Sequence, residues 1–155
     1  MKRHIIAVIF LVCAVLGFTV ATPSVGVAEQ TAPGTVNVPT GEVSLGSVEL
    51  PRRVIADGKT LAAGTYDVQV TTTMANPDVP GQLGILERWV EFRQGEDVRG
   101  REVVSIVPES EIQDVAKTAP PTIGSARVEM LKDNEYLRVW VNQGNTHYFI
   151  HLVVD

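Results

Sequence analysis

The chain has a single cysteine, Cys13, which lies inside an apolar segment near the N-terminus. The rest of the sequence therefore has no disulfide to stabilise it and no thiol for nucleophilic or redox chemistry. Cys13 is also a poor match for a lipid-modified cysteine, because Val12 stands before it where a small residue is expected. A stable fold must come from an apolar core.

Motifs of the commoner active sites and ligand sites are also missing. No G-x-S-x-G sequence marks a nucleophilic serine, no glycine-rich loop opens a phosphate-binding helix, and no D-x-[DN]-x-[DN]-G sequence marks a calcium loop. His147 and His151 share a predicted strand, whose rise separates them by about 13 Å. Ligands of one zinc ion each lie ~2 Å from it, so these two cannot chelate the same ion. We expect no cofactor, no metal and no enzymatic activity.

Carboxylates are plentiful, but they form no recognisable pair. Glu109, Glu111 and Asp114 cluster in a predicted loop, and Glu87 and Glu91 share a strand face. Hydrolysis of sugars by two carboxylates needs them about 5 Å or about 6.5–9.5 Å apart across a cleft. A linear sequence does not reveal such a pair, so a carboxylate-based hydrolase is the least favoured hypothesis.

Long apolar runs are scarce, and the clearest one lies at the N-terminus. A short basic segment, residues 1–4, precedes the apolar residues 5–18, and small residues follow up to Ala21 and Ala28. The run is short for a membrane span of ~20 residues. The pattern predicts a secretory signal peptide over residues 1–28, with cleavage after Ala28 preferred to Ala21. An uncleaved membrane anchor is the alternative, and a periplasmic or secreted location is expected.

Basic residues are outnumbered by acidic ones. Without residues 1–28, 11 Lys and Arg face 18 Asp and Glu, a net charge of −7. An acidic surface argues against binding to nucleic acid or to an anionic membrane. Residues 29–40 contain Pro33, Gly34 and Pro39 and predict a flexible lead-in. Residues 41–155 are long enough for a single β domain with one core.

Helical periodicity is nearly absent, and short alternating segments take its place. The predicted strands are 42–50, 53–56, 65–73, 85–93, 102–107, 126–130, 136–142 and 147–154. A parity change near Gly46 suggests a bulge, and Asp57-Gly58 suggests a turn. A short helix is expected over 111–117 within the long connection 108–124. The last strand is apolar on both faces and is expected to lie centrally.

This pattern predicts an all-β fold. An antiparallel β-sandwich of about seven or eight strands, immunoglobulin-like or transthyretin-like, is the preferred architecture. A small β-barrel is the alternative.

One segment, residues 53–70, carries a recognisable phrase. It contains G-K-T-L-A-A-G-T-Y at residues 58–66. It resembles small exported bacterial proteins of acidobacteria-like genomes, which have a strand on either side of this phrase. Ala62 stands where their pattern usually has proline. The resemblance implies an exported all-β domain and assigns no catalytic residue.

Two tryptophans lie on the more polar faces of their strands. Trp89 shares its face with Glu91, and Trp140 shares its face with Tyr136 and Arg138. Exposed aromatic side chains on a sheet can form a platform for sugar rings or for a partner protein. The candidate binding platform consists of Trp89, Tyr136, Arg138 and Trp140. The competing interpretation is that both faces are covered and the tryptophans are core residues.

We therefore expect an exported, non-catalytic binding or interaction module for an envelope protein or a glycan. A structural accessory protein of the envelope is the alternative.

Overall fold

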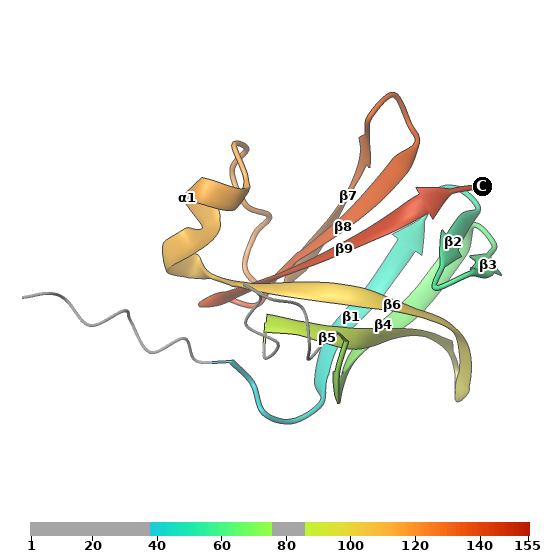
Figure 1. Cartoon of the computed structure of the whole chain (residues 1–155), viewed down its shortest axis with the longest axis horizontal. Coiled ribbons are helices and arrows are strands. Elements are labelled where there is room, and N and C mark those ends of the chain that lie inside the picture. Colours follow the sequence, from blue (N-terminus) through green and yellow to red (C-terminus); the bar gives the residue numbers. More distant parts are fainter. Residues whose placement is uncertain (1–37, 76–85) are drawn as a thin grey trace, which may run out of the picture. The chain divides into compact units, whose positions relative to one another are not determined.

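Antiparallel strands make up most of the chain in the computed structural model, which describes residues 38–75 and 86–155 (Figure 1). The predicted signal peptide, residues 29–37 of the predicted lead-in and residues 76–85 lie outside the described residues. The strands are β1 Val43–Leu50, β2 Val54–Ala56, β3 Lys59–Leu61, β4 Gly64–Met74, β5 Glu87–Gln94, β6 Asp97–Pro108, β7 Ser125–Leu131, β8 Tyr136–Asn142 and β9 Thr146–Val154. The prediction of an all-β fold is confirmed.

The nine strands belong to one sheet in which every pairing is antiparallel. Its main order is β1-β4-β5-β6-β9-β8-β7. The β2–β3 hairpin extends the sheet by pairing with the last residues of β9. The sheet folds over so that the buried faces of its two halves meet, and its edge strands β1 and β7 contact each other without pairing. The result is the expected sandwich-like architecture, with a sheet that stays open.

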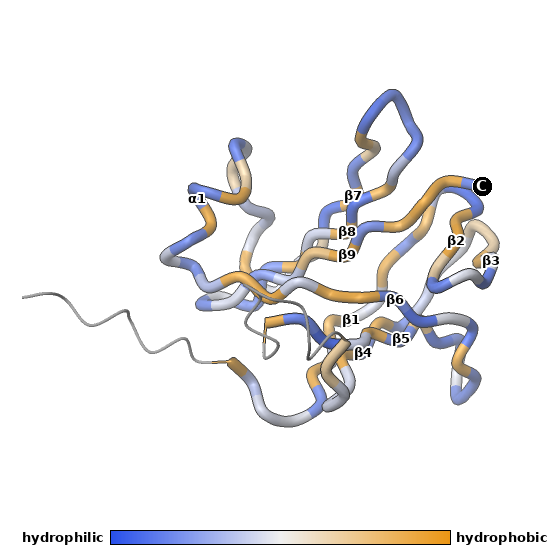
Figure 2. The backbone as a smooth tube through the Cα atoms, viewed as in Figure 1, coloured by the Kyte–Doolittle hydropathy of each residue, from blue (hydrophilic) through white to orange (hydrophobic). Residues whose placement is uncertain are grey.

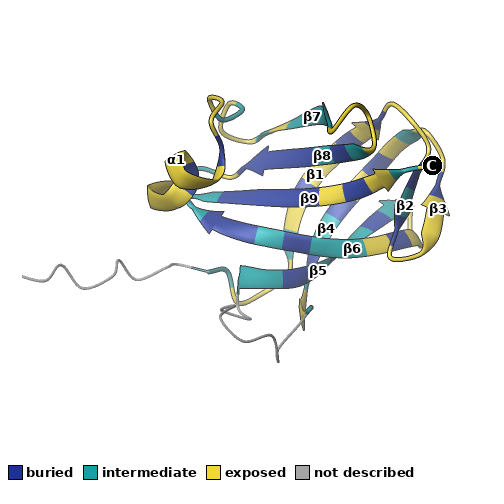
Figure 3. Ribbon diagram, turned by 45° about the horizontal axis from the view of Figure 1, so that its top comes forward, coloured by how far each residue is buried: buried dark blue, intermediate teal, exposed yellow. Residues whose placement is uncertain are grey.

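The core lies between the two halves of this sheet. Alternate residues of each strand point into it, as the period of a strand requires. Figure 3 shows nearly continuous buried positions along β8 and the first part of β9, and separate buried positions along β6. The largest core side chains on the inner faces include Tyr66, Phe92, Leu137, Tyr148, Ile150 and Leu152.

β9 occupies the centre of the sheet, as its sequence predicts. It pairs with β8 along one edge and with β6 and β2 along the other. Apolar stretches cover much of its length in Figure 2. Its inner face joins the main core, and Phe149 on its outer face is also buried. Burial on both faces explains why this strand is apolar on both parities.

Two local predictions about the first strands are confirmed. The register of β1 against β4 shifts between Ser44 and Gly46, which is the predicted bulge. Asp57 and Gly58 have φ angles of 44° and 76° and join β2 to β3 in a two-residue turn. Two successive positive φ angles characterise the type I′ hairpin turn that Asp-Gly favours. The strand after this turn, β3, was not predicted.

The connection after β6 folds back over the outer face of the sheet. It begins with a 3₁₀ turn, Glu109–Glu111, and continues as the short helix α1, Ile112–Val115. Together with β8, β9 and the end of β6 it forms a second apolar cluster, made of Val107, Ile112, Ala116, Trp140 and Phe149. The predicted short helix therefore exists, and it covers part of a sheet face that the sequence suggested to be polar.

A buried arginine binds the residues that precede β1 to the sheet through hydrogen bonds. Arg88 on β5 is 4% exposed, and its three donor groups bond the backbone carbonyl oxygens of Thr71, Pro39 and Gly41, each over 2.6 Å. Desolvation lowers the pKa of Arg88 from its ordinary value, and the charges of nearby Tyr148 and Glu42 oppose this change. The described end of the predicted lead-in is thus held in place.

Candidate functional site

Trp140 is fully buried and cannot form part of an exposed platform. Its ring packs against Phe149 with centroids 4.9 Å apart, in the cluster that α1 closes. Its Nε1–H donates to Nδ1 of His147 over 3.1 Å. The alternation of β8 does place Trp140 on the outer face, but that face is covered by the connection after β6. This part of the predicted platform is therefore wrong.

Arg138 also lies on the covered part of the outer face. It lies on β8 and pairs through Nε with the carboxylate of Glu129 on β7 over 2.9 Å. Its guanidinium also lies over the rings of Trp140 and Phe149, 5.5 Å from each centroid. Its Nε and Nη2 donate to Glu129 and its planar face lies over two rings, so Arg138 lies over the second cluster and most of its guanidinium is engaged within the sheet.

Tyr136 lies at the start of β8, where the outer face is partly exposed. Lys132 is placed over its ring, 5.0 Å from the centroid. The two residues, with Leu131 and His151, line a small hollow of about 340 Å³. Tyr136 is thus accessible, but it is separated from Trp89 by two strands.

Trp89 is the remaining member of the predicted platform. It lies on the outer face of β5 and is partly exposed. β6 and β9 lie between β5 and β8, so the two strands that carry the tryptophans are roughly 14 Å apart by strand spacing. The four predicted residues therefore do not come together in one platform.

Arg101 is a neighbour of Trp89 that the sequence did not predict. It lies on β6 opposite Glu91, diagonal to Trp89, and its guanidinium is 4.2 Å from the centre of the indole. A guanidinium at this distance makes a cation–π contact. Its Nε also pairs with Asp57 over 2.7 Å, which fixes its position. The predicted hairpin between β5 and β6 was a signal for this neighbourhood, but the bulge between Phe92 and Arg93 shifts the register.

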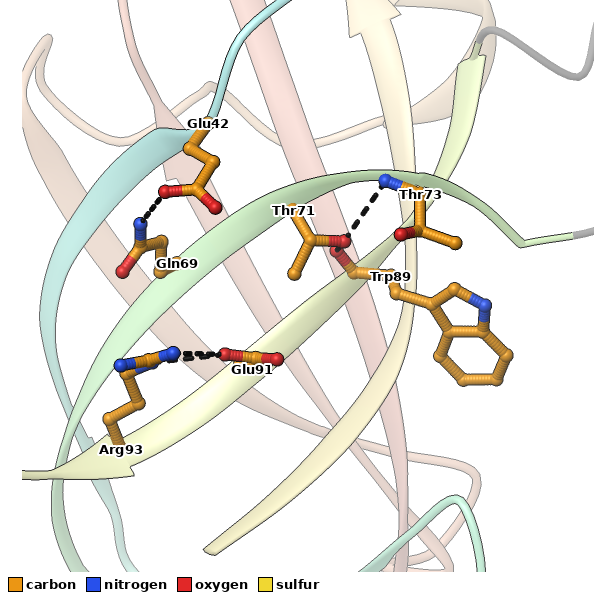
Figure 4. Close-up of polar contacts among 7 residues, drawn as sticks. All are labelled: Glu42, Gln69, Thr71, Thr73, Trp89, Glu91 and Arg93. Carbon is orange, nitrogen blue, oxygen red and sulfur yellow. Dashed lines mark hydrogen bonds and ion pairs between the residues drawn. The ribbon is translucent and has the colours of Figure 1, made fainter. Parts of the chain in front are cut away.

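Polar side chains on β4 and β5 share the outer face with Trp89, as Figure 4 shows. Gln69 donates to Glu42 over 2.7 Å, and Arg93 donates twice to one oxygen of Glu91, over 3.0 and 2.7 Å. Thr71 bonds the backbone oxygen of Trp89 over 3.0 Å. The indole extends away from the Glu91–Arg93 pair. We call Gln69, Thr71, Trp89, Glu91, Arg93 and Arg101 the Trp89 face.

The part of the chain that the structure describes contains neither a cluster of metal-ligating side chains nor a buried acid–base pair. No group of three or more His, Cys, Asp or Glu side chains there is placed to hold a metal ion. The buried polar or charged residues among them are Arg88, Asn142 and His147, and no carboxylate is buried. No helix in residues 38–75 and 86–155 is long and apolar enough to cross a membrane.

Comparisons with protein families, with curated proteins and with solved structures found no match to this chain. The fold and the site define an all-β, sandwich-like domain that carries an accessible tryptophan among fixed polar side chains.

Proposed function

We propose that the chain is an exported, non-catalytic binding module that takes a glycan on the Trp89 face. One observation carries the proposal. Trp89 is partly exposed on a sheet face among polar side chains, whereas Trp140 is enclosed.

The chemistry of the Trp89 face suits a sugar. The C–H face of a sugar ring packs on an aromatic ring, and a sugar would pack on the part of the indole that Arg101 leaves uncovered. The guanidinium of Arg101 lies beside the indole and can bond a hydroxyl group of that sugar. Glu91, Arg93 and Gln69 lie further along the same face and can bond hydroxyl groups of neighbouring sugar units. Because these side chains are already held by hydrogen bonds to one another or to Glu42, little side-chain freedom remains to be lost on binding.

Export is supported by the N-terminal sequence pattern. A basic start, an apolar segment and small residues before Ala28 are typical of a secretory signal peptide. The acidic composition of the remaining chain is compatible with a neutral glycan and unfavourable for a polyanion.

The two other functions have less support. An assembly role through strand addition needs a long uncovered edge, but the edge strands β1 and β7 contact each other. A hydrolase needs one carboxylate of raised pKa, and the carboxylates of the described residues are all at least partly exposed.

The proposal is tested by screening the purified protein on a glycan array and titrating the best ligand by isothermal calorimetry. Trp89→Ala is expected to weaken binding at least tenfold, because the stacking surface is lost. Tyr136→Ala is the matched control, since it removes another accessible aromatic side chain two strands away. Equal loss in both variants, or no saturable binding of any glycan, would show the proposal to be wrong.

A further inference from the structure

A second hollow, of about 470 Å³, lies where β3, the start of β4 and the hairpin between β5 and β6 meet. Ligand sites in proteins usually measure ~300–1,000 Å³. It is lined by Arg53, Thr60, Leu61, Ala62, Tyr66, Gln94, Val98 and Arg99. None of these residues belongs to the Trp89 face, so this is a separate place on the molecule.

The phrase G-K-T-L-A-A-G-T-Y builds half of this hollow. It supplies Thr60, Leu61, Ala62 and Tyr66, and the hydroxyl of Tyr66 donates to the backbone oxygen of Ala62 over 2.9 Å. Leu61 is 1% exposed and lies against Gly100 of β6, where a Cβ would meet its Cδ2 at 2.9 Å. The close approach at Gly100 seats the β2–β3 hairpin on β6, so the apolar wall of the hollow is fixed.

Two arginines at this hollow, like the exposed Arg52 next to Arg53, have no carboxylate within 3 Å among the described residues. Arg93, Arg101, Arg127 and Arg138 each have a carboxylate within 3 Å. Arg53 has only a long contact of 3.9 Å to Asp155, and both side chains are well exposed. Arg99 is exposed and forms no ion pair within the described residues. No carboxylate of residues 38–75 or 86–155 lines the hollow.

Both guanidinium groups stand beside an apolar wall, in a chain with 13 Lys and Arg against 18 Asp and Glu. A guanidinium binds carboxylate and phosphate groups through two parallel hydrogen bonds. The apolar side chains of Leu61, Ala62 and Val98 would contact the body of a ligand whose charged group reaches the arginines. The hollow thus combines the two features that a small organic anion requires.

We propose that this hollow binds a small organic anion, in which Arg53 and Arg99 pair with a carboxylate or phosphate group and Leu61, Ala62 and Val98 contact an apolar body. The site is independent of glycan binding at the Trp89 face. The anion-binding experiment can therefore succeed or fail whatever the result of the glycan experiment.

Phenyl phosphate, benzoate, inorganic phosphate and phenol serve as probes for the purified protein, with binding followed by backbone amide shifts in NMR titrations. Phenyl phosphate or benzoate is expected to bind at one site, with the largest shifts at Thr60, Val98 and their neighbours. Inorganic phosphate and phenol are each expected to bind at least tenfold more weakly, because each lacks one half of the interaction. The stronger of the two organic anions identifies the charged group.

Arg99→Gln is expected to weaken binding of the stronger anion at least fivefold, and addition of Arg53→Gln should remove saturable binding. Arg52→Gln is the matched control, because Arg52 is exposed beside Arg53 and does not line the hollow. Thermal denaturation verifies that each variant is folded. If Arg53→Gln is unstable, the affinity of Arg99→Gln alone tests whether the hollow binds the anion. An equal effect of Arg52→Gln, equal binding of phenol, or shifts elsewhere would overturn the proposal.

Discussion

The indole nitrogen of Trp140 donates a hydrogen bond to Nδ1 of His147 over 3.1 Å, and both side chains are fully buried. The indole can only donate, so Nδ1 must carry the lone pair and the ring proton lies on Nε2. Nε2 contacts the carboxylate of Glu109, which accepts that proton's hydrogen bond. This tautomer is assigned from the partners of the ring. His147 thereby links the connection after β6 to the sheet.

Substitution of His147 tests this link. His147→Phe leaves the indole N–H of Trp140 without an acceptor, and we expect the free energy of unfolding to fall by about 1–3 kcal/mol in urea denaturation. Glu109→Gln is the control, because its amide oxygen can still accept from Nε2 and its side chain is 53% exposed. A change below about 1 kcal/mol is expected there. Equal losses would mean that the contact with Glu109 dominates.

Tryptophan fluorescence distinguishes the two indoles. In a Trp89→Phe variant the remaining emission comes from Trp140, and we expect it to be blue-shifted and poorly quenched by acrylamide, because α1 and β9 cover that ring. In a Trp140→Phe variant, the emission of the partly exposed Trp89 should be red-shifted and more readily quenched. Ready quenching in the Trp89→Phe protein would contradict the observed burial of Trp140.

Gly100 allows the β2–β3 hairpin to approach β6, and an added methyl group should separate them. Gly100→Ala would bring a Cβ to 2.9 Å from the buried Leu61 side chain, and we expect destabilisation by about 1–3 kcal/mol. Gly41→Ala is the matched control, since nothing lies within 4 Å of its Cβ position. Its stability should be unchanged or higher by about 0.4–1 kcal/mol. Equal stability of the two variants would refute the close contact.

Loss of Arg88 should release the start of the domain. Arg88→Met leaves three backbone carbonyl oxygens without their donor, and a decrease of at least about 2 kcal/mol in the free energy of unfolding is expected. Limited proteolysis near residues 38–41 should become faster. Arg99→Met, at an exposed position, should change stability by less than about 0.5 kcal/mol. A stable Arg88→Met protein that resists proteolysis would argue against the anchoring role.

His151 offers a test of the local electrostatics. Desolvation within the sheet, and secondarily the positive charge of Arg138, lower the pKa of His151 from its ordinary value of 6.5. An NMR titration should therefore give a midpoint below 6.5, and Arg138→Gln should raise it. Because the unfolded chain takes up this proton more readily, His151 lowers stability as the pH falls from 6.5 through the folded-state pKa. A midpoint at or above 6.5 would contradict this expectation.

Alternation along each strand was sufficient to predict the class of fold and the central place of β9. It also placed Trp89 and Trp140 on outer faces, but it carries no information about which strands are neighbours or what covers them. The burial of Trp140 depends on how the connection after β6 folds back. β3 was missed because two of its three residues, Lys59 and Thr60, are polar and exposed.

The role of Arg88 was equally hidden. It stands on the inward parity of β5 between Leu86 and Val90, where a charged residue breaks the apolar pattern. Its burial is tolerated because each of its three guanidinium nitrogens donates to a backbone carbonyl oxygen, and those oxygens belong to residues far away in the sequence.

The position of β9 has a consequence for the order of folding. The strand that is last in the sequence supplies pairing partners to β2, β6 and β8, so the centre of the sheet cannot form before the C-terminus is available. Most of these contacts are distant in sequence, which slows folding. A chain that emerges N-terminus first, from a ribosome or across a membrane, could therefore not complete this sheet until its last residues have emerged.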